Sequence, residues 1–499
     1  MITTRSLLLA LLVLTLSLAT AAAEPGVEAP DEWDPEQGTS YSSTHTAVAT
    51  APGIPSAFLL EIEAAQHLGV DGQFQQAGTD GLLSAGPVDV LAEITFRNDR
   101  KYAEQLSGFW LGFNATLDQG GVALDLAPFT LRAGRFHHRD FVSSPYSLFV
   151  SSRDLSAPLL DLSIATSKLF FTTRWLQLNE DSRLGYPDRG ANIRSYGVQV
   201  GDLRVGYQDI AVYSGRTFDI EYLLNPIPTF FLQYARLSTG TPWAAGSNDN
   251  SILGFFADYT KPDLYGYGQV LIDDFNFNAI FFPDRTQNPF KVAWSTGGAV
   301  DLGPGRLGAY HAGATKYTFQ PYGGGSVGSA TDTRYGYTYY PEVEYTVEGE
   351  VRVIAPQENY IGYLHGENNL AFLVDYALPV DRFTTRGSLE LTISGDKSPA
   401  NPWHQYNTYL DDGEGTRFLE SDRLETKLLA AGRASAPFGP WSVFADLSLG
   451  WVWNELELVQ VPPELAGPNN TIRYFSPGTT SRPLATLTVG GSYSFEMPH

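Results

Sequence analysis

The end of the chain alternates strictly between two kinds of side chain. Within residues 485–496 every second position is apolar or glycine, and the positions between carry threonine, serine, glycine or glutamate. A period of two is that of a β-strand with two different faces. We therefore predict a closing strand with one face toward an apolar medium and the other toward water. The predicted apolar face carries Leu487, Val489, Tyr493 and Phe495.

The same alternation recurs along most of the chain after residue 55. The stretch WSVFADLSLGWVW (441–453) places an apolar residue at every odd position, with tryptophans at both ends. A tilted membrane strand needs roughly 9–11 residues between aromatic girdles. A soluble β-sandwich or propeller also alternates, but its strands average only about 5–6 residues. The pattern therefore favours an all-β transmembrane barrel.

Lipid offers no partner to an unpaired backbone group, so membrane strands must close into a ring. The alternating runs predict an antiparallel up-and-down barrel of about 18 strands, within a range of about 16–20, since bacterial single-chain barrels use even numbers. Long polar segments predict extracellular loops at 179–192, 320–337, 397–420 and roughly 457–482. The segment 217–250 is longer still and includes a stretch of helical character, so we expect it to fold inward or cap the barrel.

The N-terminus indicates export. Arg5 precedes an apolar run, SLLLALLVLTLSLA, which is shorter than a typical membrane span and ends near three alanines at 21–23. These features are typical of a cleaved secretory signal peptide, predicted at 1–23. Residues 24–54 are acidic, rich in Pro, Ser and Thr, and predict a flexible N-terminal arm. Residues 55–499 would then form the barrel, located in the bacterial outer membrane.

Composition and net charge exclude several classes of protein. The chain has no cysteine, which excludes a lipid-anchored lipoprotein, disulfides and thiolate metal sites. Its net charge of −23 makes it a poor partner for nucleic acid, whose phosphates require lysine and arginine. The sequence contains no nucleophile constellation, so we expect neither an enzyme nor a cofactor.

One motif combines histidines with a carboxylate, FHHRD at 136–140. Adjacent histidines on a strand point to opposite faces, so this is interpreted as a rim or loop feature rather than a metal site.

Charged residues on the strand faces opposite the apolar ones are candidates for the lumen. A mixed-charge wall of this kind can line a water-filled pore or cross-link into a sealed interior. The candidates are Glu61, Glu63, Asp89, Glu93, Asp118, Arg132, Arg174, Glu390, Lys427, Arg433 and Asp446.

A second set of candidates lies near the middle of the chain. Aromatic side chains there would stack on sugar rings, pack in a plug or anchor at the membrane interface, and an acidic pair at a strand end would bind a cation or cap a loop. These candidates for polysaccharide or loop contacts are Tyr222, Phe230, Phe231, Tyr234, Asp273 and Asp274.

This middle region resembles the Wzi-type capsule assembly barrels over roughly a third of the chain, centred on residues 170–280. The similarity rests on short motifs within AVYSGRTFDIEYLLNPIPTFFLQYA (211–235), NDNSILGFFADYT (248–260) and LYGYGQVLIDDFNF (264–277). The matching positions are Tyr213, Gly215, Tyr222, Leu223, Pro226, Asp249, Asn250, Gly254, Tyr267, Asp273 and Asp274. The better-known members have periplasmic helices at the N-terminus, whereas residues 24–54 do not look helical.

The resemblance implies a largely monomeric barrel of 18 strands that attaches or assembles surface polysaccharide. The mixed-charge lumen leaves a second hypothesis open, a porin-type diffusion channel for small hydrophilic solutes. Expected partners are outer-membrane lipids, the barrel-insertion machinery and, on the resemblance, surface polysaccharide.

Overall fold

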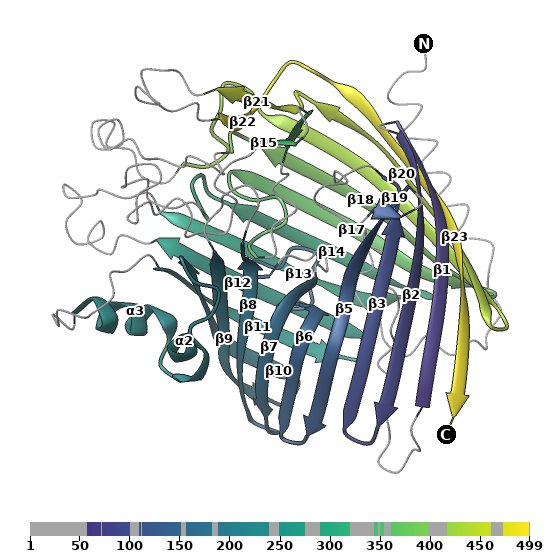
Figure 1. The fold of residues 1–499 in the computed structure, drawn as a ribbon. Helices are drawn as coiled ribbons and strands as arrows, with labels where there is room; N and C mark the ends of the chain where they lie inside the picture. Colours follow the sequence, from purple (N-terminus) through teal and green to yellow (C-terminus); the bar gives the residue numbers. More distant parts are fainter. Residues whose placement is uncertain are drawn as a thin grey trace.

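Eighteen antiparallel strands close into a barrel in the computed structural model (Figure 1). The structure describes residues 57–70, 72–99, 109–110, 112–150, 156–181, 188–238, 249–274, 290–319, 344–347, 350–353, 361–397, 417–460 and 473–498. The sheet has 19 strands, but β4 (Phe109–Trp110) pairs only with β5 and lies outside the ring. The ring closes where β1 pairs with β23, from Ala57 opposite Pro498 to Gly69 opposite Thr486. This confirms the predicted barrel.

Each strand pairs with its neighbours in chain order, so the topology is up-and-down. The ring consists of β1 (Ala57–Gly69), β2 (Gly72–Ala85), β3 (Val88–Arg97), β5 (Phe113–Leu126), β6 (Phe129–His137), β7 (Ser156–Ala165), β8 (Leu169–Asn179), β9 (Arg189–Val200), β10 (Leu203–Ser214), β11 (Asp249–Lys261), β12 (Leu264–Asp274), β13 (Lys291–Leu302), β14 (Gly305–Ala314), β17 (Asn369–Val380), β18 (Phe383–Ser394), β19 (Glu425–Phe438), β20 (Trp441–Trp453) and β23 (Arg482–Pro498). Two hairpins stand outside the ring, β15 (Glu344–Val347) with β16 (Glu350–Val353) and β21 (Leu456–Gln460) with β22 (Arg473–Pro477).

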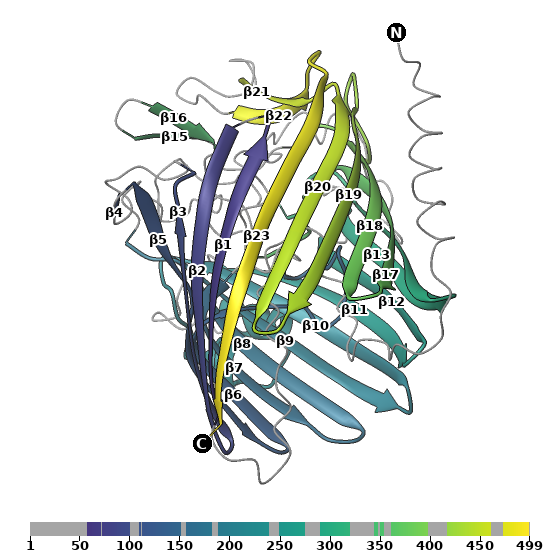
Figure 2. The ribbon, with the colours of Figure 1, turned by 90° about the vertical axis from the view of Figure 1, so that its right-hand side faces the viewer.

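The two ends of the barrel differ in their connections. At one end the strands are joined by short turns such as 201–202 and 303–304, where Gly201 and Gly303 have positive φ, as two-residue hairpin turns require. At the other end most connections are long. The chain leaves β23 at the short-turn end (Figures 1 and 2). Outer-membrane barrels have their short turns in the periplasm, so the long loops are assigned to the extracellular side.

The predicted alternation of faces is present in the closing strand. Val489 and Phe495 are 49% and 41% exposed on the outer face. Thr488 is buried on the inner face, where its hydroxyl lies 3.0 Å from Nδ1 of His67. The signal peptide (1–23) and the arm (24–54) stay predictions, because both lie outside the described residues.

Replacing Leu447 with arginine tests the outer face. Leu447 lies at the middle of β20 and is 46% exposed. An arginine at the bilayer midplane of a barrel costs about 2–4 kcal/mol, so L447R should lower the free energy of unfolding in lipid vesicles by that amount. The neighbouring Ser448 faces the lumen, and S448R should have a much smaller effect. Equal losses for the two variants would contradict the assignment of faces.

The helical segment expected near 217–250 forms α2 (Ile220–Leu224) and α3 (Thr229–Ser238). Both helices lie against the outside of the barrel, beside β8–β11 (Figure 1). The expectation that this segment folds inward or caps the barrel is therefore wrong, because outward side chains of the wall bind the helix ends. The lumen is entered by other loops, described below. None of the helices in the part of the chain that the structure describes is long and apolar enough to cross a membrane.

Candidate functional site

The loop between β6 and β7 runs into the lumen and is anchored there by Asp140. The Asp140 carboxylate accepts hydrogen bonds from Nε2 of Gln208 on β10 at 2.6 Å and from Nε2 of Gln269 on β12 at 3.1 Å. It also accepts the backbone N–H of Phe149 at 2.9 Å. One carboxylate therefore ties the two ends of residues 140–150 to each other and to the wall. Asp140 belongs to the FHHRD motif, whose first two residues end β6 and whose last three begin this loop, in agreement with its interpretation as a rim or loop feature.

Backbone groups of this loop make further bonds to the wall. The N–H of Ser143 donates to the hydroxyl of Tyr265 at 2.9 Å, and the N–H of Leu148 donates to Oε1 of Gln269 at 3.0 Å. Arg204 on β10 donates to the carbonyl oxygen of Phe141. Buried backbone groups need such partners, so the wall side chains are matched to the path of the loop.

An apolar core fills this part of the lumen. Leu148 and Phe149 of the loop are almost fully buried and belong to one cluster with Ile193, Ile210 and Leu271 of the inner wall. A barrel that conducts water has a polar inner wall. Over β9–β12 the inner wall is instead built to pack against protein.

A second inserted segment, residues 361–368, completes the packing. The N–H of Gly362 donates to the carbonyl of Phe149 at 3.1 Å. Lys397, which is buried three residues after the end of β18, donates from Nζ to the carbonyls of His365 and Glu367, at 2.7 Å each. Burial lowers the pKa of Lys397 to about 8.

The two inserted segments meet at Glu390 on β18. Its Oε1 accepts the hydroxyl of Tyr146 at 2.7 Å and lies 3.0 Å from Nε2 of His365. Burial raises the pKa of Tyr146 and lowers the pKa of His365, so the phenol keeps its proton and a neutral imidazole is favoured at neutral pH. Glu390, predicted from sequence as a lumen charge, therefore lies inside the barrel. Its contacts with Tyr146 and His365 hold both inserted segments to β18.

Substituting Asp140 should loosen the inserted loop. D140A removes the shared acceptor and leaves buried donors of Gln208, Gln269 and Phe149 without it, at about 1–3 kcal/mol each when unsatisfied. We expect a fall in the free energy of unfolding of about 3 kcal/mol or more, and faster proteolysis within 140–150 in the folded barrel. D263A, at an exposed short turn, is the matched control. Unchanged proteolysis of D140A would show that packing alone holds the loop.

The other predicted lumen charges lie on the inner face of the strands. Arg132 and Arg174 converge on Asp161 of β7, with nitrogen–oxygen distances of 3.0 and 2.7 Å. Arg433 on β19 lies 3.7 Å from Asp446 on β20. These residues cross-link neighbouring strands.

The other acidic candidates gather on the neighbouring strands β1–β3 and β5. Glu61 on β1 lies directly across from Asp80 on β2, and Glu93 on β3 accepts Nε2 of Gln119 at 2.6 Å. The remaining candidates on these inner faces are Glu63, Asp89, Asp118 at the bulge of β5, and Lys427 on β19. Their role in selectivity stays a prediction.

Among the candidates whose side chains are described, the aromatic and acidic residues do not come together into one sugar site. Tyr222 is buried, stacks on Tyr213 with ring centroids 5.9 Å apart, and donates to Asp249. Phe230 and Phe231 contact each other edge to face on α3, and Phe231 is 62% exposed outside the barrel. The side chains of Tyr234 and Asp274 lie outside the described part.

Asp273 has a structural setting on the extracellular side. Its carboxylate accepts the N–H of Phe319 at 3.0 Å and Nδ2 of Asn250 at 3.1 Å, and lies 3.5 Å from Nζ of Lys291. It therefore holds the start of the loop after β14 to the wall, which agrees with the loop-contact alternative considered from sequence.

A polar pocket at the extracellular rim was not predicted. It has a volume of about 500 Å³ and is lined by Asp396, Glu420, Ser421, Asp422, Arg423, Ser476 and Pro477. Oδ1 of Asp396 accepts the hydroxyls of Ser421 and Ser476 at 3.0 and 2.7 Å, which joins three loop segments. The long polar segments 397–420 and 457–482 predicted surface loops in this region of the sequence. Only the fold brings the ends of these segments together at one pocket.

The fold defines the class of protein, an outer-membrane β-barrel. No protein-family model matches the chain, and no curated protein matches its sequence. Among solved structures, the chain is similar to Wzi from Escherichia coli, described as an outer membrane protein involved in group 1 capsule assembly and a carbohydrate-binding β-barrel. The identity is 12%, the TM-score is 0.50, and the match covers 88% of this chain and 84% of Wzi.

Outer-membrane proteins of Pseudomonas aeruginosa also match. OprD is 12% identical with a TM-score of 0.44, over 90% of this chain and 98% of OprD. OccD3 is 10% identical with a TM-score of 0.46, over 90% of this chain and 94% of OccD3. At these identities the similarity is one of fold.

Proposed function

We propose that this protein is an outer-membrane barrel that attaches or assembles surface polysaccharide. The observation that carries the proposal is the packed lumen. Residues 140–150 and 361–368 enclose an apolar core with β9–β12, where a diffusion channel needs water. A barrel whose lumen is filled by protein in this part is better suited to present a binding surface at the cell exterior than to pass solutes.

The rim pocket is the proposed contact with the glycan. Carboxylates accept hydrogen bonds from sugar hydroxyls and serine hydroxyls both donate and accept, so the pocket formed by Asp396, Glu420, Asp422 and Ser476 offers the groups that sugars require. It opens beside the long loops, on the side assigned to the cell exterior. The likeness to Wzi in fold supports the same reading.

The test is binding of polysaccharide extracted from the cell surface of the source strain. Purified protein in detergent is titrated with the polysaccharide and binding is followed by isothermal calorimetry. We expect saturable binding that D422A weakens, while D301A, an exposed carboxylate at the short-turn end, leaves it unchanged. Absence of binding, together with unaltered cell-associated polysaccharide in a deletion strain, would overturn the proposal.

A second candidate function is a diffusion channel. It rests on the partly exposed charges of the inner wall at Glu61, Glu63 and Asp446, on β1 and β20. If water fills that side, the acidic wall would favour cations. Single-channel recording in a planar bilayer distinguishes the two functions, because steady steps typical of porins require a continuous aqueous path.

A further inference from the structure

Residues 216–238 lie on the barrel's outer wall alongside the membrane-spanning strands. They meet the wall at Thr173 on β8, Arg194 on β9 and Asp209 on β10, each near the middle of its strand. Strands of 11 or 12 residues are about as long as a tilted strand needs to cross a bilayer. The helical segment therefore sits at membrane depth rather than above it.

The wall beneath the segment inverts the usual polarity of a barrel. Ile193 and Ile210 face the lumen, while the adjacent Arg194 and Asp209 face outward. Arg194 and Asp209 are nevertheless fully buried, because α2 and α3 cover them.

The outward polar groups satisfy the ends of the two helices. Arg194 donates to the backbone carbonyls of Tyr222 and Ile227, and the Thr173 hydroxyl donates to the carbonyl of Leu223 at 2.9 Å. Asp209 accepts the N–H of Thr229, the first residue of α3, at 2.8 Å. Helix ends leave such groups unpaired, and water normally supplies their partners. Here the wall supplies them, as a water-free surrounding demands.

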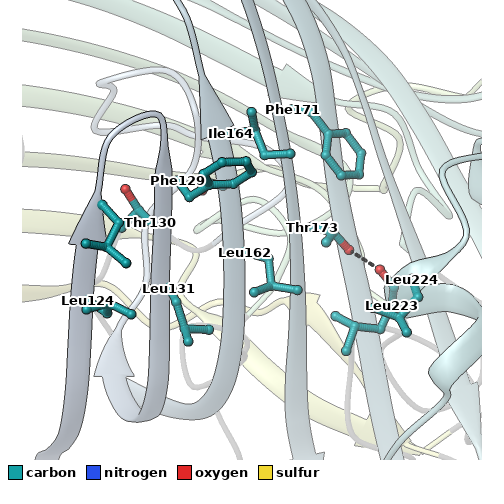
Figure 3. A pocket seen from close by; sticks show the side chains of 12 residues that line it. Leu124, Phe129, Thr130, Leu131, Leu162, Ile164, Phe171, Thr173, Leu223 and Leu224 are labelled. Atoms are coloured by element: carbon teal, nitrogen blue, oxygen red, sulfur yellow. Dashed lines mark hydrogen bonds between the residues drawn. The ribbon is translucent and has the colours of Figure 1, made fainter.

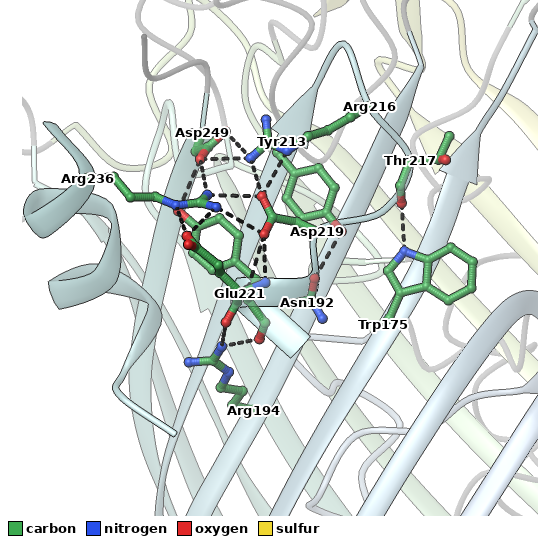
Figure 4. A network of polar contacts seen from close by, with 11 residues as sticks. Trp175, Asn192, Arg194, Tyr213, Arg216, Thr217, Asp219, Glu221, Arg236 and Asp249 are labelled. Atoms are coloured by element: carbon green, nitrogen blue, oxygen red, sulfur yellow. Dashed lines mark hydrogen bonds and ion pairs between the residues drawn. The ribbon is translucent and has the colours of Figure 1, made fainter. Parts of the chain in front are cut away.

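Most charged side chains of the segment turn toward its own interior (Figure 4), whereas Glu221 is 57% exposed and is paired with Arg236 at 2.6 Å. Arg236 binds Asp219 at 2.9 Å, and Arg216 binds both Asp219 and Asp249 at 2.9 Å. Apart from Glu221, the large exposed side chains of the segment are apolar, each between 41% and 62% exposed: Phe218, Ile220, Leu224, Ile227 and Phe231. This is the composition of a lipid-facing surface.

A groove runs beside the segment on the same wall (Figure 3). It has a volume of about 270 Å³, extends over the outer faces of β5–β8 and is bounded on one side by Leu223 and Leu224. Its walls are built mainly from leucine, isoleucine and phenylalanine, including Leu131, Leu162 and Phe171. Leu126 and Phe129, which flank the short turn 127–128, place the lower end of the groove in the periplasmic half of the membrane.

We propose that residues 216–238 are immersed in the apolar layer of the outer membrane and that the groove beside them binds one acyl chain of a phospholipid. The groove is continuous with the lipid-facing wall and reaches into the inner leaflet, which consists of phospholipid. A protein partner would bring polar atoms needing about one hydrogen bond per 100–200 Å², and the leucine, isoleucine and phenylalanine side chains that form most of this groove have none to offer. The proposal stands whichever of the two functions is correct.

Native mass spectrometry tests the groove. The full-length protein is delipidated in detergent, incubated with dioleoylphosphatidylethanolamine and released from the micelle under graded activation. We expect one phospholipid retained by the wild type, and about tenfold weaker retention by L162W, whose indole fills the groove. L447W, on the lipid-facing side of β20, is the matched control. If L162W does not give a folded, heat-modifiable barrel, L131F fills the same groove with a smaller change.

Spin labels test the immersion of the helices independently. The chain has no cysteine, so L224C, L447C and S421C each give a single labelling site. A nitroxide at position 224 should match position 447, with high accessibility to oxygen and low accessibility to a water-soluble nickel chelate, and differ from position 421 at the rim. Any one of four results would overturn the proposal. They are equal lipid retention by L162W and the wild type, a wild type that retains no lipid, a dimer joined through this face, and a water-accessible label at position 224.

Discussion

Replacing residues 141–149 with two glycines should open the lumen of the barrel to ions. Asp140 and Val150 are close enough for the Asp140 carboxylate to accept the Val150 N–H at 3.3 Å, so a short linker can join them. The change removes Leu148 and Phe149 from the lumen and exposes Gln208 and Gln269 to water. Single-channel recording in a planar bilayer should show steps several times larger than those of the wild type.

The matched control removes the β21–β22 hairpin, which forms a separate sheet outside the ring. Removing 456–477 joins Glu455 to Gly478, whose N–H already donates to the Glu455 carbonyl at 3.0 Å. That variant loses the backbone pairing of Phe475 with Lys397 but keeps residues 140–150 in the lumen, so it should keep the wild-type conductance. A wild type that already conducts like a porin, with no gain in the 141–149 variant, would contradict a lumen closed by this loop and favour the diffusion channel.

Replacing Arg194 with alanine should detach the helical segment from the wall. The guanidinium donates to carbonyls of Glu221, Tyr222 and Ile227, and it is fully buried beside Asp209. Removing one member of a buried charged arrangement costs about 3–5 kcal/mol, since the remaining groups stay buried without their partner. We expect R194A to lower thermal stability and to admit trypsin at Arg216 and Arg236.

Two further variants test whether the guanidinium of Arg194 itself holds the segment. R194K keeps the charge but loses the planar fork that reaches separate carbonyls, so it should recover only part of the stability. K261A removes an exposed cation at a short turn and should leave both stability and proteolysis unchanged. Trypsin resistance of R194A equal to that of the wild type would mean that apolar packing, rather than Arg194, holds the segment.

The strands could be predicted because their signal is local. In β20 and β23 each residue faces either lipid or lumen, so the period of two can be read from a few neighbouring positions. For the same reason Arg132, Arg174, Arg433 and Asp446 were assigned to the lumen from sequence, and the structure places them there.

The inserted loop could not be predicted, because its partners are remote along the chain. Asp140 was visible in the FHHRD motif, yet Gln208 and Gln269 follow it by 68 and 129 residues. No local pattern links these three residues. The rim pocket was missed for the same reason, since Asp396 and Ser476 are 80 residues apart.

The sequence by itself determined the closed barrel, the two faces of its strands and the helical character of the segment after β10, because period and propensity act over a few residues. Only the tertiary structure decided which loops enter the lumen and on which side of the wall the helices lie. On β9, Ile193 faces inward and Arg194 outward, the reverse of the rule for a water-filled barrel. That reversal depends on protein packed against both sides of the same strand, which no stretch of the strand's own sequence reveals.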